Sequence, residues 1–168
     1  EGFFLKQIHD RIAPIICQTK NISAQHLTVS RRATFGPSLD SSSTDNLLSD
    51  LGRLWSMYSN QSPEALLVSI GLQASSYCDS LESHQIDLKE RIPDLSTDSR
   101  FLNWISDKKV LLEIQNELNS NRAALQAYLD KSLAAQNGKV VVADIGWRGS
   151  IQDNLGRILP EVDFHGVY

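Results

Sequence analysis

Cysteine and histidine are scarce in this sequence of 168 residues, and neither is arranged as a metal site. The two cysteines, Cys17 and Cys78, lie far apart, and the four histidines are isolated from one another. Because zinc sites take such ligands in close pairs, a metal centre built from cysteine or histidine is not expected. Two separate thiols are typical of buried cysteines in a reducing compartment, which predicts a cytoplasmic protein.

Long apolar runs and an excess of positive charge are also missing. No apolar run approaches the ~20 residues that a membrane-spanning helix needs, so direct insertion into a membrane is not expected. Asp and Glu (20) outnumber Lys and Arg (16), and the net charge of −4 argues against a general nucleic-acid-binding surface. A local basic pocket remains compatible with this balance. The 41% hydrophobic residues are those of a globular domain with a real core.

Familiar catalytic and phosphate-binding motifs are absent from residues 139–152, KVVVADIGWRGSIQ. A P-loop needs a lysine before its hydroxyl residue, whereas Gly149 precedes Ser150. The dinucleotide fingerprint needs an initial glycine pair, and the hydrolase nucleophile elbow needs a closing glycine; neither is present. The chain also has no Asp-x-Asp pair of the haloacid dehalogenase type and no nucleophile–base pair, so a hydrolase is not expected.

The same segment nevertheless resembles a ligand site at the edge of a sheet. Residues 140–143 form a short apolar run, which predicts a buried strand, and Asp144 follows it directly. Gly146 and Gly149 permit a close approach of the backbone to a ligand. Ser150 begins a helical pattern, and the free N–H groups at a helix start favour a phosphate. The alternative is a plain strand-to-helix turn capped by Ser150.

Helical periodicity accounts for most of the remaining chain. The helices expected from it cover residues 4–15, 44–58, 62–72, 75–83, 97–135 with a break near Asp107, and 150–159. Strands are expected at 25–30, 140–143 and 162–168. Arg31 and Arg32 directly follow the first strand, where paired guanidinium groups either clamp an anion or form a solvated pair on a loop.

The order of these elements predicts an α/β fold. Strands that alternate with helices favour a small, mostly parallel sheet, and residues 44–136 are too long for one crossover helix. We therefore expect residues 44–136 to be a large helical insertion, or cap, in the sheet. The chain lacks an initiator methionine and ends on an incomplete strand, so we expect residues 1–168 to be a single domain excised from a longer protein.

Residues 140–150, VVVADIGWRGS, resemble the sugar-phosphate loop of type I phosphoribosyltransferases. In that family an apolar strand runs into acids, then a short loop ending in a hydroxyl residue, then a helix. The resemblance implies that Asp144 binds the ribose hydroxyls and that residues 146–150 hold the 5-phosphate. Ile145 stands where the family has a second acid, and Trp147 and Arg148 replace threonine-type residues.

A closer resemblance involves three segments, residues 1–5, 27–33 and 144–152. Together they resemble a phosphoribosyltransferase-like module of bacterial surface-polysaccharide proteins, which often adjoins a haloacid-dehalogenase-like phosphatase or a glycosyltransferase domain. This resemblance implies the transfer of a phosphoribosyl group from 5-phosphoribosyl 1-diphosphate (PRPP), accompanied by Mg²⁺, to a glycan or lipid-linked sugar acceptor. The helical insertion would cover the donor or select the acceptor.

The resemblance also implies roles for individual residues. Asp144 and Arg31 are the expected catalytic residues, because transfer at the anomeric carbon depends on positioning and on neutralising the leaving pyrophosphate. Residues expected to bind substrate are Glu1, Gly2, Ser30, Arg32, Gly146, Trp147, Arg148, Gly149, Ser150 and Gln152. The alternative function is a non-catalytic interaction module that docks on a neighbouring phosphatase or glycosyltransferase domain, which the missing second acid at Ile145 favours.

Overall fold

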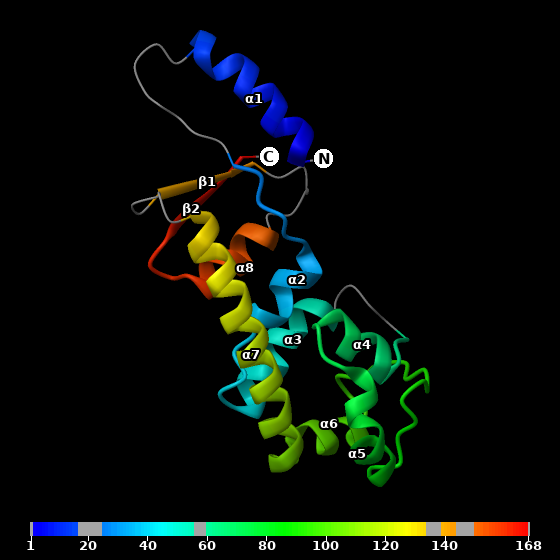
Figure 1. The fold of residues 1–168 in the computed structure, drawn as a ribbon. Helices are drawn as coiled ribbons and strands as arrows, with labels where there is room; N and C mark the ends of the chain where they lie inside the picture. The colour runs from blue at the N-terminus through cyan, green and yellow to red at the C-terminus, as the bar shows by residue number, and fades with distance from the viewer. Residues whose placement is uncertain (1, 17–24, 56–59, 134–138, 144–149, 168) are drawn as a thin grey trace. The chain divides into compact units, whose positions relative to one another are not determined.

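The computed structural model describes residues 2–16, 25–55, 60–133, 139–143 and 150–167, which form a mixed α/β structure in which helices dominate (Figure 1). The helices are α1 (Gly2–Ile16), α2 (Arg31–Phe35), α3 (Thr44–Trp55), α4 (Pro63–Ser69), α5 (Cys78–Ser83), α6 (Ser99–Ser106), α7 (Lys108–Leu133) and α8 (Ser150–Ile158). Two 3₁₀ turns, η1 (Gly36–Ser38) and η2 (Ala74–Tyr77), and two strands, β1 (Lys139–Ala143) and β2 (Asp163–Val167), complete the list.

The chain divides into two compact units, one of which is formed by two separate stretches of sequence. The helical unit comprises Arg32–Leu125, and the sheet unit comprises Glu1–Arg31 together with Gln126–Tyr168. The helical unit is thus inserted, in sequence, between the two parts of the sheet unit. The sequence predicted a helical insertion at residues 44–136 in one α/β domain.

The sheet unit is built on a strand–helix–strand motif, as the sequence predicted. β1 and β2 are parallel, with Lys139 paired with Asp163 and Ala143 with Val167. Parallel neighbours need a crossover, and α8 supplies it and packs against β2 (Figure 1). Proline at position 160 follows the end of α8 and cannot continue the helix.

The two faces of this sheet differ in exposure. Phe164 is 9% exposed, whereas Val141 and Val167 are 66% and 57% exposed. Successive side chains of a strand point to opposite faces, so the alternation assigns one inner and one outer face. The prediction of a buried strand at residues 140–143 is therefore wrong, because the side chains of β1 alternate between exposed and half-buried. Further buried apolar side chains of this unit come from α7, α8 and the residue after α8: Leu129, Leu155, Ile158 and Leu159.

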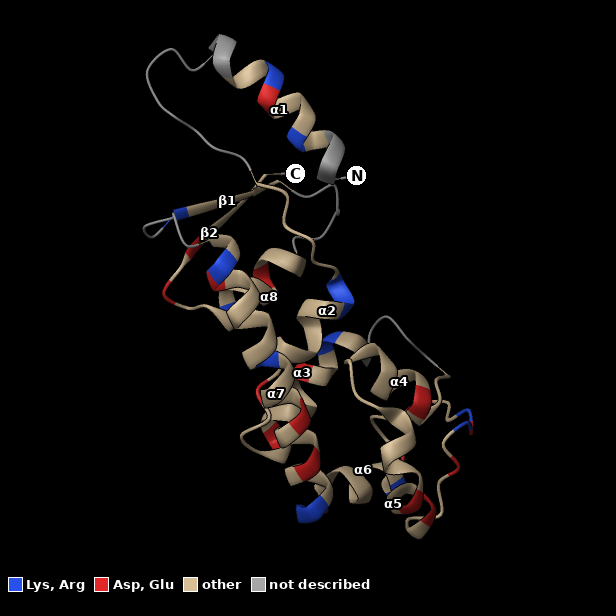
Figure 2. Cartoon of the chain, in the orientation of Figure 1, with Lys and Arg blue, Asp and Glu red and all other residues tan. Residues whose placement is uncertain are grey.

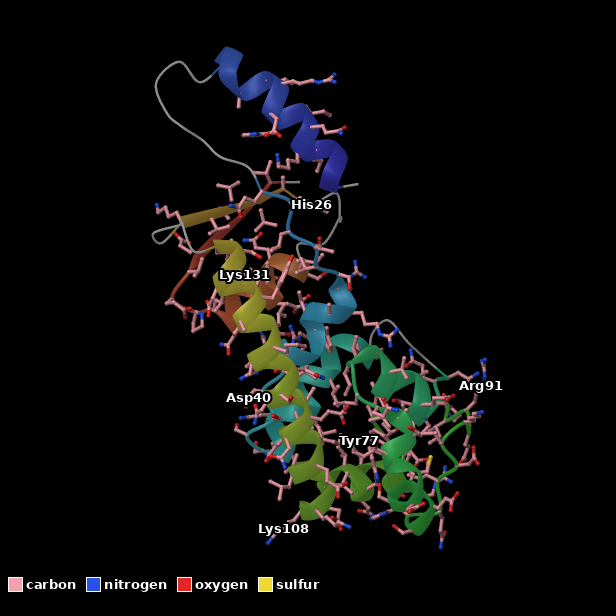
Figure 3. The ribbon with its side chains drawn as sticks, viewed as in Figure 1. His26, Asp40, Tyr77, Arg91, Lys108 and Lys131 are labelled. Atoms are coloured by element: carbon pink, nitrogen blue, oxygen red, sulfur yellow. The ribbon has the colours of Figure 1, made fainter. Side chains whose placement is uncertain are left out.

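The helical unit has the larger apolar core. Trp104 is fully buried, its ring centroid lies 5.3 Å from that of Phe101, and it meets Tyr77 edge-on at 6.0 Å (Tyr77 is labelled in Figure 3). Leucine and isoleucine side chains, together with Phe35, Ala74 and Val110, fill the rest: Leu39, Leu47, Leu51, Leu54, Leu66, Leu67, Ile70, Leu72, Leu81, Ile86, Ile92, Leu95, Ile105, Ile114 and Leu118. Most of these follow the helical stripes of the sequence, which is why the periodicity identified them.

Polar side chains hold the irregular segments of this unit. Nε of Arg122 donates to the carbonyl oxygen of Pro37 at 2.7 Å, and another guanidinium nitrogen donates to that of Leu39 at 2.6 Å. The Glu117 carboxylate accepts hydrogen bonds from the Tyr77 hydroxyl at 3.0 Å and from the Gln73 N–H at 2.7 Å. Each contact satisfies backbone or hydroxyl groups that no helix or sheet ladder satisfies.

The predicted break near Asp107 is confirmed. α6 ends at Ser106 and α7 begins at Lys108, and the Asp107 carboxylate accepts the backbone N–H groups of Lys109 at 2.7 Å and Val110 at 3.2 Å. Asp98 caps α6 in the same way, accepting the N–H groups of Arg100 and Phe101. Aspartate is favoured at these positions because its carboxylate satisfies otherwise unpaired N–H donors.

Acid should destabilise the helical unit in part through Asp98. The Arg100 guanidinium, which hydrogen bonds to this carboxylate, holds the pKa of Asp98 below its ordinary value of 3.8. A carboxyl group with a lowered pKa in the folded state stabilises the fold above its unfolded pKa of about 3.9, and that stability is lost as the pH falls through the folded value. Urea unfolding between pH 6 and 2 should therefore show falling stability. Asp98→Asn keeps a capping side chain at the start of α6 but has no carboxyl group to titrate, so its stability should fall less between pH 6 and 2. A pH dependence equal to that of the wild type would contradict the role assigned to Asp98.

The prediction of a strand at residues 25–30 is wrong. These residues have no regular secondary structure, and Val29 N donates to the carbonyl oxygen of Leu27 at 3.2 Å in a tight local turn. Thr28 N donates instead to the hydroxyl oxygen of Tyr128, at 2.9 Å. The backbone of this segment thus finds partners in a local turn and in a side chain of α7, which the weak alternation of QHLTVS could not reveal.

Candidate functional site

All of the predicted site residues except Arg32 belong to the sheet unit, in which β1 precedes α8. The carboxyl ends of β1 and β2 lie at the same edge of the sheet, because Ala143 pairs with Val167 in the parallel register. α8 begins at Ser150, seven residues after the end of β1. In α/β sheets this edge is the usual place for ligands, because loops with free backbone groups meet there.

Arg31 and Ser150 come together in this unit. Nε of Arg31 donates a hydrogen bond to the hydroxyl oxygen of Ser150 at 3.1 Å, across 119 positions of sequence. Arg31 is exposed and Ser150 is half-buried. The contact therefore brings a cationic side chain to the first residue of α8, at the end of the helix that carries the positive pole of its dipole.

The charge around the start of α2 is positive. α2 begins with Arg31 and Arg32, and Figure 2 shows this helix start in blue. Both arginines are exposed. Arg32 is the first residue of the helical unit, whereas Arg31 belongs to the sheet unit. Of these two arginines, Arg31 is the one that the structure joins to another predicted site residue, Ser150.

Gln152 is held by the sheet. Its side-chain amide nitrogen donates to the carbonyl oxygen of Phe164, in β2, at 2.8 Å. At the other end of α8, the amide nitrogen of Gln126 donates to the carbonyl oxygen of Ile158 at 3.0 Å. A glutamine of α8 thus ties the start of the helix to β2, and a glutamine of α7 ties its last carbonyl to α7.

Of the remaining predicted site residues, the structure describes Gly2 and Ser30. Gly2 is the first residue of α1, and Ser30 is exposed in the irregular segment before α2. Six of the predicted residues lie outside the described part of the chain: Glu1, Asp144, Gly146, Trp147, Arg148 and Gly149.

Sequence reasoning missed Tyr128 and Gln126. The Tyr128 hydroxyl accepts the N–H of Thr28, three residues before Arg31, and so helps to hold the segment that carries this arginine. Both residues lie in α7 next to the apolar stripe that includes Leu129. Their sequence signal is that of polar residues on an amphipathic helix, so the stripe alone could not single them out.

The donor set for a metal ion is limited in the described residues. Within those ranges, no three His, Cys, Asp or Glu side chains are grouped so that they could hold a metal ion. Asp144, the carboxylate that the sequence assigned to the sugar, lies outside them. Of the helices that the structure describes, none is both long and apolar enough to cross a membrane.

Two comparisons, with protein-family models and with curated proteins, found no relative of this chain. No protein-family model matches the chain, and no curated protein matches its sequence. The contacts of Arg31, Ser150 and Gln152 are therefore the structural observations from which a function can be inferred.

Proposed function

We propose that this protein transfers a phosphoribosyl group from PRPP to a sugar acceptor in bacterial surface-polysaccharide synthesis. The observation that carries the proposal is the hydrogen bond of 3.1 Å between Arg31 and Ser150. The resemblance in sequence assigned one of these residues to pyrophosphate and the other to the sugar phosphate, and the two side chains are in contact. A strand–helix–strand unit with Ser150 at the start of its helix supports the same assignment.

In this proposal, the described residues act through position and charge. The N–H groups of the first turn of α8 and the Ser150 hydroxyl bind the 5-phosphate of the donor. The Arg31 guanidinium binds the pyrophosphate and offsets the negative charge that it gains as the bond to the anomeric carbon breaks. Its hydrogen bond to Ser150 restricts the arginine before the donor arrives, so less side-chain freedom is lost on binding. Asp144, which follows β1 in the sequence, accepts hydrogen bonds from the ribose hydroxyls.

Mg²⁺ enters this proposal together with the donor. In phosphate-binding sites this ion is commonly held by substrate phosphates, waters and one or two carboxylates, so it does not require a cluster of protein ligands. Asp144 is the carboxylate of this chain that would contribute to it. When bound, the ion neutralises pyrophosphate charge. The acceptor is a glycan or a lipid-linked sugar, and a neighbouring phosphatase or glycosyltransferase domain would act on the product or precursor.

Calorimetric titration of the full chain with PRPP and Mg²⁺ tests the proposal. The wild-type chain should bind, and Arg31→Ala should weaken binding by roughly 10- to 100-fold, the range expected for loss of a charge-assisted contact. Asp144→Asn should also weaken binding strongly. Arg157→Ala is the matched control, because it removes the same charge from an exposed residue in the last turn of α8. It should change the affinity by less than about 2-fold.

Two results would count against the proposal. Wild-type protein that gives no heat with PRPP, or with any other phosphosugar, would refute donor binding. Equal losses in Arg31→Ala and Arg157→Ala would show that binding depends on net charge alone and not on the contact with Ser150.

A non-catalytic interaction module is the second candidate. The exposure of the outer sheet face, with Val141 at 66% and Val167 at 57%, favours it, because parallel sheets usually have both faces covered. The partner would be a phosphatase or glycosyltransferase domain. This candidate requires that Val141→Lys weakens association with that domain while Asp144→Asn and Arg31→Ala leave the affinity unchanged.

A further inference from the structure

The start of α8 is anchored to the sheet by a side chain. Gln152, in the first turn of α8, donates its amide hydrogen to the carbonyl oxygen of Phe164 at 2.8 Å. Phe164 is a buried β2 residue that pairs with Val140 of β1. The hydrogen bond therefore fixes the N-terminal turn of α8 against the strand whose neighbour, β1, leads into the predicted loop.

The far end of the same helix is also held by a glutamine amide, which in this case comes from α7. The Gln126 amide donates to the carbonyl oxygen of Ile158, the last residue of α8, at 3.0 Å. Both hydrogen bonds join a glutamine amide to a backbone carbonyl, at 2.8 and 3.0 Å, but the glutamine lies on α8 in the first and on α7 in the second. They differ in position, because Gln152 lies two residues from Ser150, whereas Gln126 contacts the opposite end of the helix. The Gln126 hydrogen bond therefore serves as the comparison for the Gln152 hydrogen bond.

We propose that Gln152 is a positioning residue, which holds Ser150 within reach of Arg31, and not a group that binds the donor directly. Its amide nitrogen is engaged by Phe164, two residues along the helix from the Ser150 hydroxyl that accepts from Arg31. A shift of the first turn by about 1 Å away from Arg31 would stretch the Arg31–Ser150 distance of 3.1 Å beyond hydrogen-bonding range. This inference rests on the proposed function for its importance, although the positioning itself can be measured without any ligand.

The test compares Gln152→Leu with Gln126→Leu in the full chain. Each variant removes one amide–carbonyl hydrogen bond from α8. Three properties are measured: the midpoint of urea unfolding, the exchange rate of the Arg31 Nε–H with water by nitrogen-15 NMR, and the affinity for PRPP with Mg²⁺. The NMR signal is assigned by its disappearance in Arg31→Lys. Gln152→Glu serves as a second variant, because it keeps the side-chain size and replaces the N–H donor with an acceptor.

The positioning role predicts a specific combination of results. Both leucine variants should lower the unfolding midpoint to a similar degree. Gln152→Leu and Gln152→Glu should in addition speed the exchange of the Arg31 Nε–H and weaken PRPP binding, each by about 2- to 10-fold, the range for one hydrogen bond. Gln126→Leu should leave the exchange rate and the affinity within about 2-fold of wild type.

Other combinations would overturn the inference. Weaker PRPP binding in Gln152→Leu with an unchanged Arg31 signal would mean that Gln152 contacts the donor directly. Equal changes of the Arg31 signal in the Gln152 and Gln126 variants would mean that α8 responds as a whole to any lost anchor. If the wild-type chain binds no PRPP, the proposed function fails, and the Arg31 signal alone still decides whether Gln152 positions Ser150.

Discussion

Gly36→Ala is expected to destabilise the helical unit by about 3 kcal/mol or more. A Cβ atom on Gly36 would lie 1.9 Å from the carbonyl oxygen and 2.9 Å from the carbonyl carbon of Ile70. Both are backbone atoms, and Ile70 is fixed as the end of α4 by its N–H contacts to Leu66 and Val68. The buried turn at Gly36 and the end of α4 would have to separate to admit one methyl group, which a close-packed core resists.

Gly156→Ala is the matched control for this prediction. Gly156 lies inside α8, and an added Cβ would meet nothing within 4 Å. Alanine forms helix better than glycine, so this variant should be more stable than wild type by about 0.5 to 1 kcal/mol. Urea unfolding followed by far-ultraviolet circular dichroism measures both variants. A Gly36→Ala protein as stable as wild type would mean that this turn moves away from α4 with little cost.

Trp104→Ala should cost the helical unit about 3 to 5 kcal/mol. The Trp104 side chain is fully buried, packs on Phe101 and Tyr77, and donates its indole N–H to the hydroxyl oxygen of Ser80 at 3.0 Å. Its removal leaves a large cavity in the centre of the helical unit and takes a donor from Ser80. Chemical unfolding followed by circular dichroism gives the free-energy difference.

Two comparisons separate the contributions in this second prediction. Trp104→Phe keeps an aromatic ring and loses the N–H donor, so it should cost less than alanine. Leu112→Ala shortens a side chain of α7 that is 56% exposed, and it should change stability by less than about 0.5 kcal/mol. Equal losses in Trp104→Ala and Leu112→Ala would contradict the assignment of Trp104 to the core.

The sequence predicted those elements whose signals are local. The break between α6 and α7 followed from Asp107, whose carboxylate caps α7, and the end of α8 followed from Pro160. The parallel pairing of β1 and β2 followed from the helix between them. In each case neighbouring residues decide the structure, so a pattern over a few positions was sufficient.

Features that depend on distant residues were not predictable in this way. Residues 25–30 form no strand, because Thr28 bonds to the hydroxyl of Tyr128, 100 positions away. A pattern of strand propensity cannot show that a backbone N–H will donate to a distant side chain and not to a neighbouring strand. The helix expected at 75–83 is confirmed over Cys78–Ser83, whereas residues 75–77 belong to the 3₁₀ turn η2.

The candidate site combines both kinds of feature. Resemblance in sequence assigned Arg31 and Ser150 to one site, an assignment that stays a prediction, and the structure joins the two side chains by a hydrogen bond. Gln152 was expected to bind substrate, and its contact with Phe164 suggests a different role that only the folded chain can show. The glycine loop and Asp144 lie outside the described residues, so their roles stay predictions.

The insertion of the helical unit between two parts of the sheet unit has a consequence for biosynthesis. Ribosomes add roughly 5 to 20 residues each second, so Arg31 exists for about 6 to 24 s before Ser150, 119 positions later, is made. All of Arg32–Leu125 is synthesised within that interval. The helical unit can therefore acquire its structure while the nascent chain is still growing, whereas the sheet unit must wait until β2 has left the ribosomal tunnel.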